Sequence, residues 1–229
     1  MPPLTLSFDV FPFRLSGLVV GALLNDASVF MALGPALHQP PYKAPPAAPV
    51  LAIKPRNTLA RDGSPIEVPA GVEALEIGAS LGIVIGRTAC RVARGDVRSV
   101  IAGYSIVADV SVPLPSHYRP ALRFRARDGF CPIGPRVVAA RDVAAPDALD
   151  VRVHIDGALV HASNTAGRVR GVAELIEAVT EFMTLQPGDL LLLGAAPGAP
   201  RARAGQRVAI EIEGIGRLSN PLIAEGARA

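Results

Sequence analysis

An aspartate ends one of the most apolar stretches of the chain. Residues 100–107 read VIAGYSIV, and Asp109 comes two residues later. A carboxylate at the mouth of a buried strand is costly unless it is paired, hydrogen-bonded or bound to a metal ion. We therefore take Asp109 as the first candidate for a functional residue. The structural alternative is that Asp109 caps the turn at Ser111 or pairs with Arg127.

A cationic and polar segment directly follows another apolar run, at residues 50–53. The segment reads KPRNT and contributes Lys54, Arg56 and Asn57. Such a segment at the end of a buried strand is typical of a loop that binds an anion. The alternative, equally open from these residues alone, is a solvated turn that begins at Pro55.

Arginines are concentrated in residues 111–136, where Arg119, Arg123, Arg125 and Arg127 occur. The last three alternate along the chain, so in an extended conformation they would share one face. A row of guanidinium groups suits carboxylate or phosphate oxygens, because each group offers a planar bidentate fork. A basic exposed strand is the structural alternative.

The overall composition excludes several classes of protein. The chain has 229 residues, 50% of them apolar, and a formal net charge of +3. No basic block occurs, so nucleic acid is not an expected partner. Asn25 and Asp26 interrupt the apolar stretch at residues 15–37, so we expect no membrane span and no membrane partner. No basic segment precedes this stretch as it would in a signal peptide, and we expect a cytoplasmic protein.

The chain contains two cysteines, Cys90 and Cys131. Neither occurs in a C-x-x-C motif or in a spacing typical of zinc sites. We expect both to be buried free thiols, which agrees with a reducing compartment.

The apolar patterns predict that strands position these groups. Patterns typical of strands occur at residues 18–24, 50–53, 81–85, 100–107, 151–155, 190–193 and 208–212. One clear helix is predicted at residues 171–184, and residues 29–33 allow one or two helical turns. We expect a mostly β fold with few helices, in the α+β class, with curled sheets or a partial barrel.

A proline-rich segment divides the chain. Residues 38–50 read HQPPYKAPPAAPV, which can form neither a regular helix nor a central strand. We therefore expect a small N-terminal subdomain with its linker at residues 1–49. The main domain is expected at residues 50–229.

Several of these pieces resemble, in order, the fumarylacetoacetate hydrolase family. The matching segments are KPRNT at 54–58, SLGIVIGRTA at 80–89, IAGYSIVADVS at 101–111, FCPIGP at 130–135, LQPGD at 185–189 and EIEGIGRLSNP at 211–221. The resemblance covers nearly the whole chain from about Val20. It implies the rolled mixed sheet of this family, which is similar to a β-clip, and usually a dimer.

The resemblance is closest to one branch of the family, through PPYKAPP at 40–46, DVSVPLPSHYRPA at 109–121 and RDGFCPIGP at 127–135. That branch acts in 4-hydroxyphenylacetate (homoprotocatechuate) breakdown. It decarboxylates 5-oxopent-3-ene-1,2,5-tricarboxylate and isomerises 2-hydroxyhepta-2,4-diene-1,7-dioate, as a two-domain chain or as two subunits. This chain is similar to the N-terminal domain or first subunit. The alternative is a non-catalytic partner that supports an active paralogue.

The resemblance also implies a metal ion. Active members hold Mg²⁺ or Mn²⁺ with an E-x-E motif and with the aspartate that corresponds to Asp109. In this chain the two glutamate positions are occupied by Gly78 and Ser80. A lone carboxylate holds such a cation poorly, so we expect metal binding to be weak or absent. The expected assembly is a homodimer or a hetero-oligomer with a metal-binding paralogous subunit.

Other family positions are changed as well. Two polar residues of the family correspond here to Ser116 and to Ala195 or Ala196. The His/Glu dyad of the hydrolytic and decarboxylating members would lie near Val29 and Ala32. The family lysine before FCPIGP corresponds to Arg125. The resemblance implies that Lys54 and Asp109 carry any catalysis, with Asp109 as the residual metal ligand. It implies that Arg56, Asn57, Arg125 and Arg127 bind the carboxylates of a di- or tricarboxylate substrate.

Overall fold

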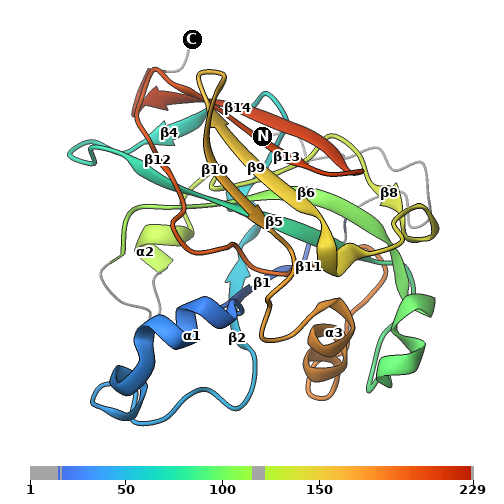
Figure 1. Cartoon of the computed structure of the whole chain (residues 1–229). Helices are drawn as coiled ribbons and strands as arrows, with labels where there is room; N and C mark the ends of the chain where they lie inside the picture. Colours follow the sequence, from blue (N-terminus) through green and yellow to red (C-terminus); the bar gives the residue numbers. More distant parts are fainter. Residues whose placement is uncertain (1–14, 16, 115–121, 228–229) are drawn as a thin grey trace.

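The computed structural model describes residue 15 and residues 17–114 and 122–227 of the chain. These residues form two β-sheets and three α-helices, α1 (Ala27–Leu33), α2 (Leu122–Arg125) and α3 (Val172–Thr180) (Figure 1). The expectation of a mostly β fold with few helices is confirmed. Among the described residues, none of the helices is both long and apolar enough to cross a membrane.

The larger sheet has nine strands, in the order β2-β1-β11-β5-β6-β7-β3, with β12 paired to β5 and β8 paired to β6. The strands are β1 (Val19–Leu23), β2 (Val50–Lys54), β3 (Leu59–Arg61), β5 (Leu75–Ile85), β6 (Ile101–Ser111), β7 (Cys131–Ile133), β8 (Val138–Ala139), β11 (Leu190–Leu192) and β12 (Arg201–Ala202). The long antiparallel pair of β5 and β6 forms its centre. Both strands are buried along almost their whole length. This is why their sequences are nearly continuous apolar runs rather than alternating ones.

The two edge strands of this sheet, β2 and β3, are close neighbours in sequence. Only residues 55–58 separate the end of β2 at Lys54 from the start of β3 at Leu59. The five Cα–Cα steps from Lys54 to Leu59 span at most about 18 Å, so the two edges must lie close together. The sheet is therefore rolled, and the rolling brings the end of β2 over the middle of the sheet.

The smaller sheet has five strands, in the order β10-β9-β13-β14-β4. Its strands are β4 (Ile66–Val68), β9 (Asp150–Ile155), β10 (Ala158–Asn164), β13 (Arg207–Ile212) and β14 (Gly216–Ala224). It lies across β5 and β6 in Figure 1. A single apolar core joins β5 and β6 to β9, β13, β14 and α3. Short 3-10 helices complete the chain at Gly34–His38, Arg56–Thr58, Arg94–Ser99, Ala140–Asp142 and Pro146–Ala148.

Helix α3 is shorter than the sequence predicts. It ends at Thr180 instead of residue 184, with Glu181 as its C-cap. The first two turns bury their apolar side chains as expected, but Phe182 is 63% exposed. The chain turns after Glu181 because Leu185 forms an isolated bridge with Ala89 beside the sheet.

Strand β1 belongs to the nine-stranded sheet. It pairs antiparallel with β2 and parallel with β11. Residues 19–23, which we placed in the N-terminal subdomain, therefore share a sheet with residues of the main domain. The boundary at residue 49 itself stays a prediction.

Candidate functional site

The register of β5 and β6 places the expected metal-ligand positions beside one another. Gly78 lies opposite Asp109, and Ser80 lies opposite Val107. Alternate residues of a strand point to the same face, so the Gly78 and Ser80 positions share the face of Asp109. The sequence prediction that these three positions converge is therefore consistent with the fold.

Asp109 is held by two cations. Lys54, at the end of β2, makes an ion pair with Oδ1 of Asp109. Nη1 of Arg125, in α2, donates hydrogen bonds to Oδ1 at 3.1 Å and to Oδ2 at 2.9 Å. The side chains of Lys54, Asp109 and Arg125 are 1%, 7% and 17% exposed. We call these three residues the ion triad; its formal charge is +1.

The ion triad keeps Asp109 ionised. Burial is the largest single influence on the pKa of this carboxyl group and would raise it. The charges of Lys54 and Arg125 and their hydrogen bonds act in the opposite direction, and together they hold the pKa below its usual value. Asp109 is thus an anion that two cations already neutralise, and it is poorly suited to exchange a proton near neutral pH.

Asp109 pairs as the structural alternative expects, but with different partners. Arg127, the partner suggested by the sequence, lies instead with Nη2 at 4.0 Å from Oε1 of Glu225. Lys54 reaches Asp109 only because the sheet is rolled. Arg125 reaches it because α2 packs on the end of β6, where the N–H of Val112 donates to the carbonyl of Phe124 at 3.0 Å.

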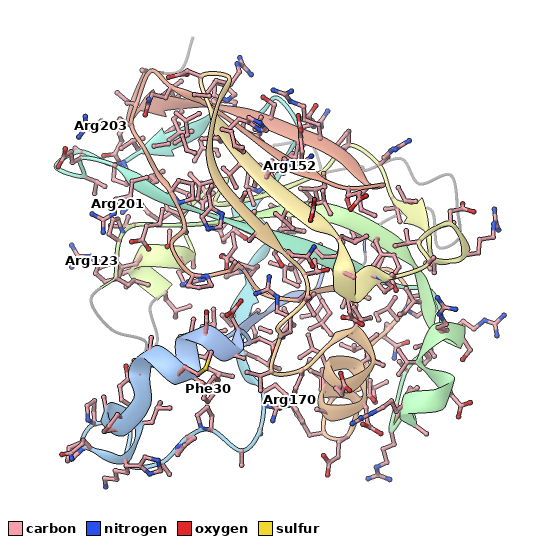
Figure 2. All side chains as sticks on the ribbon, in the orientation of Figure 1. Phe30, Arg123, Arg152, Arg170, Arg201 and Arg203 are labelled. Carbon is pink, nitrogen blue, oxygen red and sulfur yellow. The ribbon has the colours of Figure 1, made fainter. Side chains whose placement is uncertain are left out.

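The expected extended row of arginines is wrong. Residues 122–125 form helix α2, so successive side chains rotate around an axis and do not share one face. Only Arg125 joins the ion triad, whereas Arg123 lies at the outer surface (Figure 2), with its guanidinium 6.0 Å from the ring of Phe124. Arg119 and Ser116 lie outside the described residues.

The other two expected substrate-binding residues are not in the ion triad. The Nδ2 of Asn57 donates to the carbonyl of Ala126 at 3.1 Å and to Oδ1 of Asp128 at 2.8 Å. Asn57 thereby ties the KPRNT segment to the loop that follows α2, which is a structural role. Arg56 is exposed. That Arg56, Asn57 and Arg127 bind substrate stays a prediction.

The positions of the two missing glutamates are filled by close packing. A Cβ atom at Gly78 would lie 2.8 Å from the carbonyl oxygen of Asp109 and 3.1 Å from Cβ of Ala195. The hydroxyl of Ser80 donates to the carbonyl of Leu81 at 3.1 Å and accepts from the N–H of Gly194 at 3.0 Å. Both positions are therefore committed to the contact between β5 and the loop that begins at Gly194.

These residues do not fit a divalent cation. Mg²⁺ and Mn²⁺ need several oxygen ligands, usually with more than one carboxylate. In the described part of the chain, no group of three or more His, Cys, Asp or Glu side chains could hold a metal. The carboxylate of Asp109 is occupied by Lys54 and Arg125. Two positive charges beside it would also repel a metal ion.

Sequence reasoning missed an acid on the same face of β5. Glu76 lies two residues before Gly78 and opposite Ser111. Its Oε1 is 3.3 Å from Nη2 of Arg201, on the neighbouring strand β12. The alternation in the sequence EIGAS was the available signal, because it places Glu76, Gly78 and Ser80 on one face.

A second buried ion pair also escaped the sequence analysis. Arg168 pairs with Asp26, which caps α1 by accepting from the N–H of Ser28 at 3.0 Å. Burial lowers the pKa of Arg168, and Asp26 acts against this shift. The pair fixes the start of α1. The helix carries Val29 and Ala32, and neither of these side chains can transfer a proton.

The two cysteines differ in environment. Cys131 is buried beside the ion triad, and burial raises the pKa of its thiol to about 12. Cys90 is exposed, so the expectation that both thiols are buried is wrong for this residue. Cys90 lies between Ala89 and Arg91 in a surface bend after β5.

A cavity of about 570 Å³ lies near the site but does not contain the ion triad. It is lined by Gly71, Val72, Glu73, Ala74, Val112, Pro113, Arg201, Arg203 and Gln206. Figure 2 shows Arg201 and Arg203 side by side along this edge of the molecule. Both arginines pair with glutamates, at positions 76 and 73. The cavity is thus a charged surface hollow next to the strand ends.

Comparison with known proteins identifies the family. The family model described as fumarylacetoacetate (FAA) hydrolase C-terminal matches residues 18–223. The chain belongs to this family. It is 41% identical over 211 residues to the 4-hydroxyphenylacetate degradation bifunctional isomerase/decarboxylase of Escherichia coli. The aligned residues cover 92% of this chain and 48% of that protein. The chain spans about half the length of this curated relative.

Solved structures confirm the fumarylacetoacetate hydrolase fold. The 2-hydroxyhepta-2,4-diene-1,7-dioate isomerase from Mycobacterium marinum superposes with a TM-score of 0.76 and 32% identity, over 93% of this chain and 77% of that one. The maleylpyruvate hydrolase from Sphingobium sp. SYK-6, in complex with manganese(II) and pyruvate, superposes with a TM-score of 0.75 and 25% sequence identity. The match covers 94% of this chain and 73% of that one. The expected rolled mixed sheet of this family is therefore confirmed.

Proposed function

We propose that this chain is one half of an isomerase/decarboxylase of 4-hydroxyphenylacetate breakdown. The substrates are 2-hydroxyhepta-2,4-diene-1,7-dioate and 5-oxopent-3-ene-1,2,5-tricarboxylate. Identity to the bifunctional relative from Escherichia coli over about half of that protein supports the assignment. Likeness to the dioate isomerase from Mycobacterium marinum supports it independently.

Within this assembly, we propose that the chain is the half without a metal centre. The carrying observation is the ion triad, in which Lys54 and Arg125 neutralise the one family carboxylate that remains. Metal-assisted stabilisation of an enolate then belongs to a paralogous subunit or domain with an intact E-x-E motif. The chain forms a homodimer or, for activity, a hetero-oligomer with that paralogue.

The chain's own contribution is electrostatic. Lys54 and Arg125 place positive charge at the site. The open-chain substrates carry carboxylates, which this charge can bind. Because the described residues of the ion triad offer no base that can move a proton, the chain orients or retains substrate and supports its partner. The alternative is that the isolated chain turns over substrate slowly by means of these cations alone.

The test is turnover of the tricarboxylate by the purified chain, by a paralogue that carries E-x-E, and by the two together, with Mg²⁺ and with EDTA. We expect no CO₂ release from the chain alone. The mixture should release more CO₂ than the paralogue alone, and EDTA should abolish the release. A matched control is the paralogue with both glutamates replaced by glutamine, which should be inactive in the mixture.

Each other outcome assigns the chemistry differently. CO₂ release by the isolated chain that EDTA abolishes would overturn the proposal, because it would require a metal centre in this chain. Release that EDTA does not affect would favour the alternative, in which Lys54 and Arg125 act alone. A mixture no more active than the paralogue would remove the supporting role.

A further inference from the structure

A second cavity, of about 410 Å³, lies away from the ion triad and is lined by Tyr104 of β6. It lies between α3, the 3-10 helix Arg94–Ser99 and residues 144–148. Figure 1 shows α3 beside this 3-10 helix, near the start of β6. Tyr104 precedes Asp109 by five residues, so the two side chains point to opposite faces of the sheet, about 17 Å apart along the strand. The cavity is therefore separate from the candidate site.

The hydroxyl of Tyr104 lacks a partner. The residue is 3% exposed, and its hydroxyl makes no hydrogen bond with any other described residue. The hydroxyl is not enclosed in the core, because it borders the cavity. Burial raises the pKa of Tyr104 to about 12; the charge of Asp147 adds to this rise and that of Arg98 opposes it. The hydroxyl is thus a proton donor at neutral pH whose acceptor must come from the cavity.

Arg98 and Asp147 bring one free charge of each sign to the cavity. Within the described residues, the guanidinium of Arg98 makes one hydrogen bond, from Nη2 to the carbonyl of Ala144 at 3.2 Å. Most of its five N–H donors remain available. Oδ1 of Asp147 accepts from the N–H of Val172 at 2.8 Å, and Oδ2 has no partner in the same part of the chain. Arg94, the other arginine of the lining, is already paired with two glutamates.

The rest of the lining is largely apolar. The side chains of Val97, Ile101, Pro146 and Val172 contribute to it. Small-molecule sites in proteins have volumes of about 300–1,000 Å³ and combine apolar walls with a few placed polar groups. The cavity has this character, with a hydroxyl donor, a cation and an anion around an apolar wall.

We propose that this cavity binds a small zwitterion with an apolar body, the class to which apolar α-amino acids belong. The carboxylate of the ligand accepts from the hydroxyl of Tyr104 and from Arg98, and its ammonium group donates to Oδ2 of Asp147. The apolar body packs on the wall of the cavity. A ligand with only a carboxylate would meet the repulsion of Asp147, and a ligand with only an ammonium group would leave Tyr104 and Arg98 without acceptors.

The experiment measures binding of L-leucine to the full chain by ligand-observed NMR or titration calorimetry. Two analogues with the same apolar body are the matched controls. 4-Methylpentanoate lacks the ammonium group, and 3-methylbutylamine lacks the carboxylate. We expect L-leucine to bind one site per chain. Each analogue should bind at least about tenfold more weakly, because each loses charge-assisted hydrogen bonds.

Three variants make the result specific to this cavity. Tyr104→Phe removes only the hydroxyl and should weaken L-leucine binding by about two- to tenfold. Asp147→Asn should weaken binding of L-leucine but strengthen binding of 4-methylpentanoate, a reversal that a loss of structure would not produce. Arg217→Gln removes an exposed arginine that pairs with Glu211 in the smaller sheet, and it should leave binding unchanged. Thermal denaturation of each variant checks that it is folded.

Three results would overturn the inference. Absence of L-leucine binding in the millimolar range would mean that only water occupies the cavity. Equal binding by Tyr104→Phe and the wild type would mean that the ligand lies elsewhere. Equal affinity for L-leucine and 4-methylpentanoate would exclude recognition of a zwitterion. None of these results bears on turnover with a paralogue, because that proposal concerns the ion triad on the other face of the sheet.

Discussion

Replacement of Asp109 by asparagine should destabilise the protein strongly. The substitution keeps the size of the side chain but removes the only anion of the ion triad. It leaves the ammonium of Lys54, which is 1% exposed, without a counter-charge. Removal of one partner from a buried ion pair costs about 3–5 kcal/mol. For a chain of this size, that corresponds to a fall in Tm of roughly 6–20 °C.

The assay is urea denaturation at neutral pH, with thermal denaturation as a second probe. Two controls fix the interpretation. Glu177→Gln breaks a solvent-exposed pair with Arg94 and should have little effect on stability. Lys54→Met combined with Asp109→Asn removes both buried charges and should recover most of the loss, because apolar replacement of a buried pair is often close to neutral.

The pH dependence gives an independent check of the same reasoning. The pKa of Asp109 is lower in the folded protein than in the unfolded chain, where it is about 3.9. The carboxylate therefore stabilises the folded state above the unfolded value, and this contribution is lost as the pH falls through the folded pKa. The stability difference between the wild type and Asp109→Asn should be constant from about pH 5 to 8 and shrink below about pH 4.

A cost as small as that of Glu177→Gln would refute the argument. It would mean that water or side-chain motion screens the ion triad, despite its burial. A double variant as unstable as Asp109→Asn would refute the part that concerns Lys54. In that case, the loss would arise from Arg125 or from the packing of Asp109 itself.

Three further predictions follow from the same structure. Gly78→Ala should lower the free energy of unfolding in urea by about 1–3 kcal/mol, because its Cβ would lie 2.8 Å from a backbone oxygen. The control Gly95→Ala, whose Cβ would have no atom within 4 Å, should leave stability nearly unchanged. Equal effects of the two substitutions would contradict this reasoning. Arg168→Met should lower stability by about 3–5 kcal/mol, since it strands a largely buried aspartate, and a loss below 1 kcal/mol would count against the pair. A thiol reagent should modify only Cys90 in the folded protein, and both Cys90 and Cys131 in urea. Rapid modification of Cys131 in the folded protein would show that this thiol is accessible to solvent.

The strands at the centre of the fold are predictable from the sequence because they are buried on both faces. Residues 81–85 fall inside β5 and residues 101–107 of the predicted 100–107 fall inside β6, although both strands extend beyond the predicted ranges. β14 was not predicted. Asn220 and Pro221 are typical turn residues, yet both lie inside this strand and pair with β13. Tertiary pairing outweighs local preference there.

The sequence indicates that Asp109 needs a partner, but it does not indicate which residues pair with it. The cost of an unpaired carboxylate was sufficient to single out Asp109, and the rolled sheet was needed to show what pairs with it. Lys54 and Asp109 are 55 residues apart, and no local pattern indicates that the two edges of the larger sheet meet. The alternation of Arg123 and Arg125 fits a strand and a short helix equally well, so spacing alone could not identify which arginine points inward.

The residues at the two glutamate positions and Asp109 are each held by contacts that a metal site would have to break. Glutamates at Gly78 and Ser80 would not by themselves recreate a metal site. The first would collide with the backbone at Asp109, and the second would break the hydrogen bond that Gly194 donates to Ser80. Asp109 would still be occupied by its two cations. The small residues at these two positions instead let β5 pack closely against the loop that begins at Gly194.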